Sequence, residues 1–369
     1  MQKTDDNRVE IFYKKVKKPV IKFIVIVAIL FILLELGSFV ALKFYQSLDS
    51  RENLDVYQNE EWTKGYFNEF HDSNKGEYTP YIDYRRVPNY QGKYINLDDK
   101  SVRKTIPDCS DASQNPVRIF IFGGSTIWGT GARDEGTIPS LISKNLCDKN
   151  IPAKVINFGE SGYTNTHDMI RLLLELRQGN QPNIAIFYDG VNDVWSSYQN
   201  GVAGLPQNVY NRKADFNTRN QIRLFNFIKY SNFMRVINEL LFLLEEKQLN
   251  VDENLEKQTA SVYYNNTIII KNIGKQEGFK TFFYWQPTIY TKETLSEDEK
   301  NKINKNIVVG NMYVNVAEEI KNSNEIQDLT GIFNEDDEMI FIDDVHISEK
   351  GNKIVADYIA QDIVNYLNA

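Results

Sequence analysis

Hydrophobic and polar residues follow three successive patterns along the chain. An apolar run covers residues 23–42, a polar and aromatic stretch covers 45–115, and short apolar runs then alternate with amphipathic segments. An apolar run of about 20 residues is typical of a helix that crosses a bilayer. The middle stretch, rich in tyrosine and interrupted by proline, predicts short strands and turns and no helix. The alternation that follows predicts a parallel sheet with helices on both faces.

The alternating region allows individual elements to be predicted. Short apolar runs predict buried strands, and longer segments with apolar residues every three or four positions predict helices. The predicted strands are 117–123, 154–158, 183–188 and 280–285, and the predicted helices are 138–146, 166–177 and 349–367. The expected fold class is α/β, a three-layer α/β/α sandwich with a mostly parallel sheet, preceded by one N-terminal transmembrane helix.

A long insertion, 196–278, separates the third and fourth predicted strands. Its stretch 224–244 is strongly apolar but carries polar residues every three or four positions, which predicts one polar stripe on a mostly buried helix. Lys229 and Arg235 argue against a second membrane span. The pattern fits either plain packing or a lid near a site, and packing is the expectation.

The apolar run near the N-terminus predicts an uncleaved signal anchor. Five lysines precede it: Lys14, Lys15, Lys17, Lys18 and Lys22. Because positive residues stay on the cytoplasmic side, the chain after about residue 44 is expected outside the cytoplasm. Glu35 within the run costs roughly 2–3 kcal/mol if it lies deep, which the surrounding aliphatic residues offset. A cleavable signal peptide is the rival interpretation, but its apolar core is usually shorter. The lysine flank argues against a soluble core helix.

Charge and composition exclude several classes of function. The formal net charge of -8 argues against a nucleic-acid partner, because phosphate binding requires a basic face. Three histidines and two cysteines stand in no familiar zinc-binding spacing, so we expect neither a metal nor a cofactor. Outside the cytoplasm, Cys109 and Cys147 can form a disulfide, since both lie at the same end of the predicted sheet. Two free buried thiols fit the sequence equally well.

A candidate nucleophile follows the first predicted strand. Gly123 and Gly124 allow a sharp turn there, which places Ser125 at the carboxyl edge of the sheet, where α/β proteins have their sites. A nucleophilic serine needs a base and an acid that orients the base. Asp343 and His346, three residues apart before the last helix, supply both. The Asp343 carboxylate can reach one ring nitrogen, which leaves the other free for the Ser125 proton.

Two glycine-containing turns follow the second and third predicted strands, and both are expected at the same edge of the sheet as Ser125. They are 157–164, of sequence NFGESGYT, and 190–193, of sequence GVND. A glycine lets a backbone N–H approach a reacting oxygen, and the amide of Asn192 is a fixed donor. Donors of these types form oxyanion holes, in which the loss of one raises the barrier by roughly 3–4 kcal/mol.

With these four segments the chain resembles the SGNH hydrolases, the GDSL-like esterase and lipase superfamily. The resemblance covers residue 117 to the C-terminus and implies that Ser125 is the nucleophile, His346 the general base and Asp343 the orienting acid. It also implies oxyanion donation from the backbone of Ser125, the backbone of Gly162 and the side chain of Asn192. The usual Gly-Asp-Ser is Gly-Gly-Ser here, so Gly124 departs from the family pattern. The rival elbow G-x-S-x-G fails at Ile127.

The expected organisation places a cytoplasmic segment at 1–22, the anchor at 23–43, a stalk and accessory lobe at 44–115, and the hydrolase-like domain at 116–369. Several aromatic residues cluster near the predicted strand ends: Trp128, Tyr163, Trp195, Tyr198 and Trp285. They can stack on a sugar ring or hold an acyl chain, and core packing is an equal alternative. His167, just inside a predicted helix, is expected to be a surface or capping residue.

The expected function is therefore that of a membrane-anchored serine esterase. A catalytic domain tethered outside the membrane meets cell-envelope polysaccharide first, so the expected partner is an O-acylated glycan and the expected reaction removes O-acetyl groups. An O-acyltransferase with the same acyl-enzyme, and a lipase or lysophospholipase, are the enzymatic alternatives. The non-enzymatic alternative is an inactive, membrane-tethered glycan-binding protein, against which the complete set of four segments argues.

Overall fold

The structure is a computed structural model that describes residues 15, 17–46, 49–57, 60–218, 231–244, 251 and 253–369. The chain divides into two compact units. The smaller comprises Met1–Asp49 with Asp215–Gln248, and the larger comprises Ser50–Ala214 with Leu249–Ala369. Helix α8, Val209–Thr218, crosses the boundary between them.

The smaller unit contains two described helices that contact each other, α2 (Lys18–Gln46) and α10 (Asn232–Leu244). Residues 18–45 are long and apolar enough to cross a membrane by length and composition. Glu35 of α2 accepts hydrogen bonds from the backbone N–H of Asn232, the amide side chain of Asn232 and the backbone N–H of Phe233, at 2.9 Å, 3.1 Å and 3.1 Å. The carboxylate thus satisfies N–H groups that a helix start leaves without partners. Residues 219–230, which include part of the helix predicted at 224–244, lie outside the described residues.

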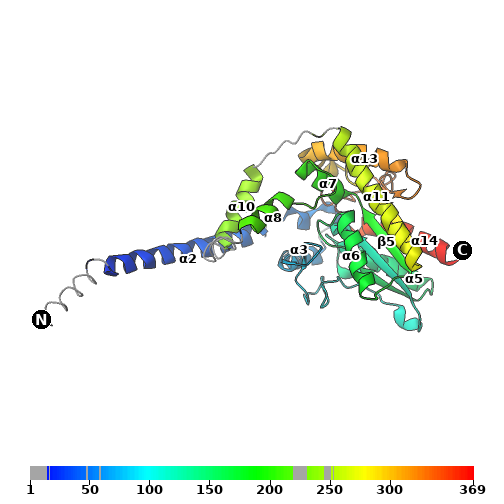
Figure 1. Cartoon of the computed structure of the whole chain (residues 1–369), viewed down its shortest axis with the longest axis horizontal. Helices are drawn as coiled ribbons and strands as arrows, with labels where there is room; N and C mark the ends of the chain where they lie inside the picture. Colours follow the sequence, from blue (N-terminus) through cyan, green and yellow to red (C-terminus); the bar gives the residue numbers. More distant parts are fainter. Residues whose placement is uncertain are drawn as a thin grey trace. The chain divides into compact units, whose positions relative to one another are not determined.

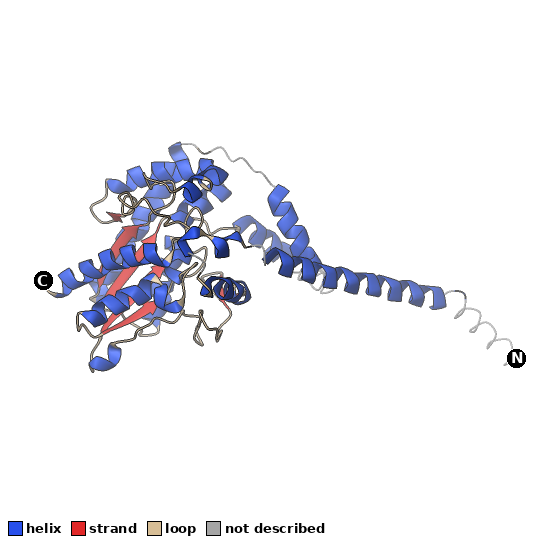
Figure 2. Ribbon diagram, turned by 180° about the vertical axis from the view of Figure 1, so that it is seen from behind, coloured by secondary structure: helices blue, strands red, loops and turns tan. Residues whose placement is uncertain are grey.

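The larger unit is built around a five-stranded parallel sheet, which confirms the predicted fold class. Its strands, in spatial order, are β4 (Ala153–Asn157), β3 (Val117–Gly123), β5 (Ile184–Asp189), β6 (Lys280–Trp285) and β7 (Gln327–Asp328). Figure 2 shows these strands between helices. The short edge strand β7 pairs with the end of β6 and was not predicted.

Alternating side chains of the central strands supply two separate cores. Ile119 and Ile121 of β3 pack with helices α5 (Ile138–Asp148) and α14 (Glu349–Leu367) on one face. Phe120 and Phe122 point to the other face, which is covered by α6 (Asn165–Arg177), α11 (Glu253–Glu277) and α13 (Ile307–Lys321) (Figure 1). Burying a side chain such as these stabilises the fold by roughly 2–3 kcal/mol. A strand buried on both faces is apolar, as β3 is from Ile119 to Phe122.

The segment 196–278, predicted as an insertion, contains a helix that belongs to the layer of helices on the sheet. Within 196–278, α11 packs on α6 and on β6 and connects the third strand to the fourth. Helix α7 (Val191–Asn200) begins directly after β5, and the short α12 (Glu297–Lys300) follows β6. The crossover to β6 thus includes α11 as part of the helical layer.

The prediction of no helix in 45–115 is wrong. This region contains α3 (Trp62–Ser73) together with a small antiparallel pair, β1 (Gly76–Tyr78) and β2 (Tyr84–Arg86). Tyr66 and Phe67 are buried in a cluster that also contains Trp128 and Ile342. The helix forms because this aromatic face packs against the body of the larger unit. The residues themselves have a weak intrinsic preference for helix.

Cys109 and Cys147 are joined in a disulfide, one of the two alternatives that the sequence left open. Their Cα atoms lie 5.8 Å apart, within the range that such a bond requires. The bond ties the segment before β3 to the end of α5.

Candidate active site

Three adjacent strands bring the predicted site residues to one edge of the sheet. Strand β3 ends at Gly123 and runs into the short helix α4 (Ser125–Trp128). Strand β4 ends at Asn157, shortly before the loop that contains Gly162, and β5 ends at Asp189, shortly before Asn192. Because the strands are parallel neighbours, their carboxyl ends meet.

Ser125, His346 and Asp343 form a continuous chain of hydrogen bonds. The Nε2 atom of His346 lies 2.7 Å from Oγ of Ser125. Its Nδ1 atom lies 2.8 Å from Oδ2 and 2.9 Å from Oδ1 of Asp343. These distances are those at which a histidine can take a proton from a hydroxyl while a carboxylate fixes its tautomer.

The loop that carries Asp343 and His346 is held by its own backbone. Ile342 N–H donates to the carbonyl of His346 at 2.9 Å, and Phe341 pairs with Ile347. The N–H groups of Val345 and His346 donate to Oδ1 of Asp343 at 3.0 Å and 2.7 Å. The carboxylate and the ring therefore have little freedom to separate.

The electrostatic surroundings keep Asp343 ionised. Burial alone would raise the pKa of the Asp343 carboxyl. The charge and hydrogen bond of His346 together with the nearby Arg51 guanidinium outweigh burial and hold that pKa well below its usual range. A charged Asp343 is the form that can stabilise an imidazolium.

Gly162 lies in the loop after β4, and Asn192 lies in the first turn of α7, against the backbone of Gly124. Gly162 has a φ of +76°, a conformation that favours glycine, and a Cβ there would meet the Tyr84 hydroxyl at 2.6 Å. The Nδ2 atom of Asn192 donates to the carbonyl of Tyr163 at 2.8 Å. Its Oδ1 accepts from Nε2 of Gln207 at 3.2 Å, so the orientation of the amide is fixed from both ends.

The departure at Gly124 has a structural reason. A Cβ at this position would collide with Nδ2 of Asn192. The amide of Asn192 therefore lies directly against the backbone of the nucleophile turn, in space that any larger residue at 124 would occupy.

The family assignment rests on the extent of one match. The family model described as GDSL-like Lipase/Acylhydrolase matches residues 119–359, which include all four of the segments discussed above. The chain belongs to this family. It is accordingly an ester-bond hydrolase by family. None of the curated proteins compared with the chain matches it.

Solved structures that are similar to this chain include esterases and a lipase. The acetyl xylan esterase AlAXEase is 19% identical over 67% of this chain and 100% of its own, with a TM-score of 0.36. The psychrotrophic esterase EstA from Pseudoalteromonas sp. is 15% identical over 68% and 99%, with a TM-score of 0.36. The lipase Lip_vut3 from a goat rumen metagenome is 14% identical over 66% and 95%, with a TM-score of 0.40.

Four side chains beside the GDSL-like segments were not predicted from the sequence. They are Arg51, Tyr84, Arg86 and Gln207. Each comes from a segment outside the family's four motifs and reaches the site only through tertiary contacts. A lone arginine or glutamine in a loop carries no signal in a single sequence that would mark it.

A buried ion pair anchors the loop of Gly162 to the region before the sheet. Arg86 of β2 donates from its backbone N–H and its Nε to Glu160, at 3.1 Å and 3.2 Å, and from Nη2 to Ser161 Oγ at 2.7 Å. Its guanidinium lies 3.6 Å from the centre of the Trp128 ring. Tyr84 donates a further hydrogen bond to the carbonyl of Ser161. The loop that presents Gly162 is thus fixed by β2.

Most of the aromatic residues proposed for substrate contact are in the core. Trp128 and Trp285 are fully buried and Tyr163 is 2% exposed, so core packing, the alternative given for them, fits this structure. Trp195 and Tyr198 are partly exposed and retain a surface that a ligand can touch.

His167 closes the start of α6 as a buried capping residue. Its Nδ1 accepts a hydrogen bond from the backbone N–H of Thr164 at 3.1 Å, and its ring stacks on Tyr163. The capping role expected for it is observed, whereas a surface position is not.

Three buried carboxyl groups lie near the end of β5 and the starts of α6 and α7: Asp168, Asp189 and Asp193. Burial raises the pKa of all three, to about 6 for Asp189 and well above the usual value for Asp168 and Asp193. The nearby charge of Asp189 adds to burial in raising the pKa of Asp168, and Asp193 accepts from the backbone N–H of Asn165 at 3.2 Å. Across the described part of the chain, no group of three or more histidine, cysteine or acidic residues is arranged to hold a metal ion.

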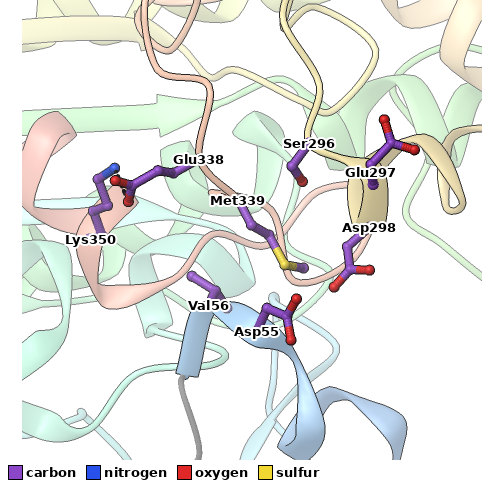
Figure 3. A pocket seen from close by; sticks show the side chains of 8 residues that line it. All are labelled: Asp55, Val56, Ser296, Glu297, Asp298, Glu338, Met339 and Lys350. Carbon is purple, nitrogen blue, oxygen red and sulfur yellow. Dashed lines mark hydrogen bonds and ion pairs between the residues drawn. The ribbon is translucent and has the colours of Figure 1, made fainter.

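Two hollows differ in their relation to the site. A narrow apolar gap, too small to admit a water molecule, is lined by Val191 and Val345, the residues that precede Asn192 and His346, together with Trp195 and others. A larger hollow of about 480 Å³ is acidic and is lined by none of the triad residues (Figure 3). In it, Glu338 pairs with Lys350 at 2.8 Å.

Proposed function

We propose that this chain is a membrane-anchored serine esterase that removes short O-acyl groups, in particular O-acetyl groups, from cell-envelope polysaccharide. The observation that carries the proposal is the hydrogen-bonded series from Ser125 through His346 to Asp343 at 2.7 Å and 2.8 Å. Family membership supports ester hydrolysis independently of this geometry.

In the proposed reaction, Ser125 Oγ attacks the ester carbonyl carbon while His346 Nε2 takes its proton. The negative oxygen that forms accepts hydrogen bonds from the backbone of Ser125, the backbone of Gly162 and the amide of Asn192. The C–O bond to the sugar then breaks, and His346 returns the proton to the departing hydroxyl. Water attacks the acyl-enzyme by the same steps, with His346 again as base, which releases the carboxylic acid and restores Ser125.

A short acyl group is part of this proposal, and the series of esters described below tests it against the lipase alternative.

The proposed location is outside the cytoplasm, on the anchor formed by residues 18–45. The lysines before the anchor support a cytoplasmic N-terminus. The disulfide between Cys109 and Cys147 supports an oxidising compartment for the larger unit. Fusion of alkaline phosphatase to the C-terminus tests this topology: active enzyme is expected, and an inactive fusion would contradict it.

The function is tested with the full chain in detergent micelles and p-nitrophenyl esters of two, four and eight carbons. Wild type is expected to prefer acetate, and Ser125→Ala to lose at least about 10³-fold in kcat/KM. Ser110→Ala, at the opposite end of the sheet, is the matched control. Equal rates for wild type and Ser125→Ala would show that Ser125 is not the nucleophile. A preference for octanoate would favour a lipase over the esterase.

Hydrolysis and acyl transfer are separated by a second experiment. An acetylated polysaccharide is incubated with the enzyme and an unacetylated glycan acceptor, and both acetate release and acceptor acetylation are measured. Released acetate without acetylated acceptor is expected. Acetylation of the acceptor would identify an O-acyltransferase.

A further inference from the structure

A guanidinium from the start of the larger unit contacts the acid of the proposed triad. Arg51, in the 3₁₀ turn Ser50–Asn53, places Nη1 3.5 Å from Oδ2 of Asp343. The same oxygen accepts from Nδ1 of His346 at 2.8 Å. Arg51 and His346 therefore share one carboxylate oxygen.

Aromatic rings of α3 hold the Arg51 side chain in this position. Its guanidinium carbon lies 5.1 Å from the ring centre of Phe67 and 5.3 Å from that of Phe70. The side chain is 22% exposed, and that of Asp343 is 28% exposed. A cation over two rings is attracted to their faces, which limits the positions that the guanidinium can adopt.

We propose that Arg51 is a positioning residue of the active site, which holds the Asp343 carboxylate against His346 and sets the pH range in which His346 accepts the proton of Ser125. The proposal rests on the triad of the proposed function and adds a fourth member to it. In this proposal Arg51 acts on His346 through Asp343.

The charges around the His346 ring give the expected direction of the pH shift when Arg51 is replaced. Besides His346, the titratable groups that act electrostatically on Asp343 are Arg51, Tyr57 and Asp344. Of these, Arg51 is the cation. Its removal leaves the carboxylates of Asp343 and Asp344, so a protonated imidazole becomes more favourable. The enzyme then loses its base at a higher pH than wild type does.

The test is the pH dependence of the full-length protein in detergent micelles. Both kcat/KM for p-nitrophenyl acetate and the rate constant of inactivation by a fluorophosphonate are measured from pH 5 to pH 9. For Arg51→Gln, the midpoint of the acid limb is expected to move up by about 0.5–1 pH unit, the size of one charge at about 6 Å in a partly solvated site. Arg51→Lys, which keeps the charge, is expected to stay close to wild type. Arg177→Gln, an exposed arginine beside Tyr81, is the matched control.

A purely structural role would lower activity equally at all pH values and leave the midpoint in place, and this result for Arg51→Gln would overturn the inference. If that variant does not fold, Arg51→Cys provides the same comparison, because both native cysteines are bonded to each other. Modification with a cationic methanethiosulfonate is expected to restore the wild-type midpoint and a neutral one to leave it shifted. Equal midpoints after both modifications contradict the inference. If the wild-type protein shows no esterase activity that depends on Ser125, the proposed function itself is refuted.

Discussion

Gly124 is the residue at which the nucleophile turn differs from the usual Gly-Asp-Ser of its family. The space that an aspartate side chain would occupy is taken by the amide of Asn192. Restoring the usual residue by Gly124→Asp should therefore displace Asn192 and weaken the proposed oxyanion hole.

For Gly124→Asp we expect kcat for p-nitrophenyl acetate to fall by about 10²-fold, near the effect of losing one oxyanion donor. The melting temperature, measured alongside, reports whether the variant is folded. A folded Gly124→Asp with wild-type kcat would show that Asn192 is not needed in its present position.

Gln207 is a second residue whose effect should pass through Asn192. It donates to Oδ1 of Asn192 at 3.2 Å and so fixes which end of the amide faces the nucleophile turn. Gln207→Ala is expected to lower kcat by about 10-fold with little change in KM, because an amide that can rotate is a poorer donor in the transition state. Gln199→Ala, which removes a half-buried glutamine bonded to Asn208 in the same region, serves as the control and should leave kcat unchanged. Equal kcat values for the two variants would contradict this role.

The candidate site residues that could be identified from the sequence are those that occur in local patterns. Asp343 and His346 are three positions apart, and Ser125 follows an apolar strand and two glycines, so their types and spacing were informative. Arg51 and Gln207 meet their partners only through the fold. Their contacts depend on packing between distant segments, which no local pattern encodes.

Among the elements, the disulfide connects the approach to β3 with the end of α5 across 38 positions of sequence. Closing a loop of this length restricts the unfolded chain. In the loop-entropy description this stabilises the fold by about 4 kcal/mol.

The double variant Cys109→Ala/Cys147→Ala is therefore expected to lose about that much free energy of unfolding, measured by urea denaturation of the full chain. Wild type treated with reductant should show the same loss. An unchanged unfolding midpoint in both would mean that the bond contributes nothing to stability.

Helices α5, α6 and α14 were predicted from apolar residues at helical spacing, and the central strands were predicted from short apolar runs. Strands β3, β5 and β6 are apolar runs bounded by polar or glycine residues, and their burial follows from that composition. Helix α3 was missed because Tyr66 and Phe67 become a helix face only when they pack on the larger unit. Strand β7 was missed because two residues contain no periodicity.

For the molecule as a whole, the buried carboxyl groups of Asp168, Asp189 and Asp193 should make stability depend on pH. Their pKa values are raised in the folded chain, whereas an unfolded aspartate titrates near 3.9. The folded chain therefore binds more protons than the unfolded chain above about pH 4. Stability must fall as pH rises through this window, to about pH 6 for Asp189 and beyond it for the other two.

Replacing one of these aspartates by asparagine should reduce the loss of folding stability at high pH. We expect Asp168→Asn to raise the melting temperature by about 2–6 °C at pH 8 and by less at pH 5. Asp337→Asn, at an exposed position, should change neither value. A gain for Asp168→Asn that is equal at the two pH values would mean that ionisation of this group is not the cause.

The hydrogen bonds from α10 to Glu35 have a practical consequence for making a truncated, water-soluble protein. Deleting residues 1–49 alone would leave the first N–H groups of α10 without their carboxylate, and α10 without the helix that packs against it. Such a truncation is expected to aggregate. Removing Asp215–Gln248 as well, and bridging the gap with a flexible glycine-serine linker, should yield a monodisperse protein in size-exclusion chromatography.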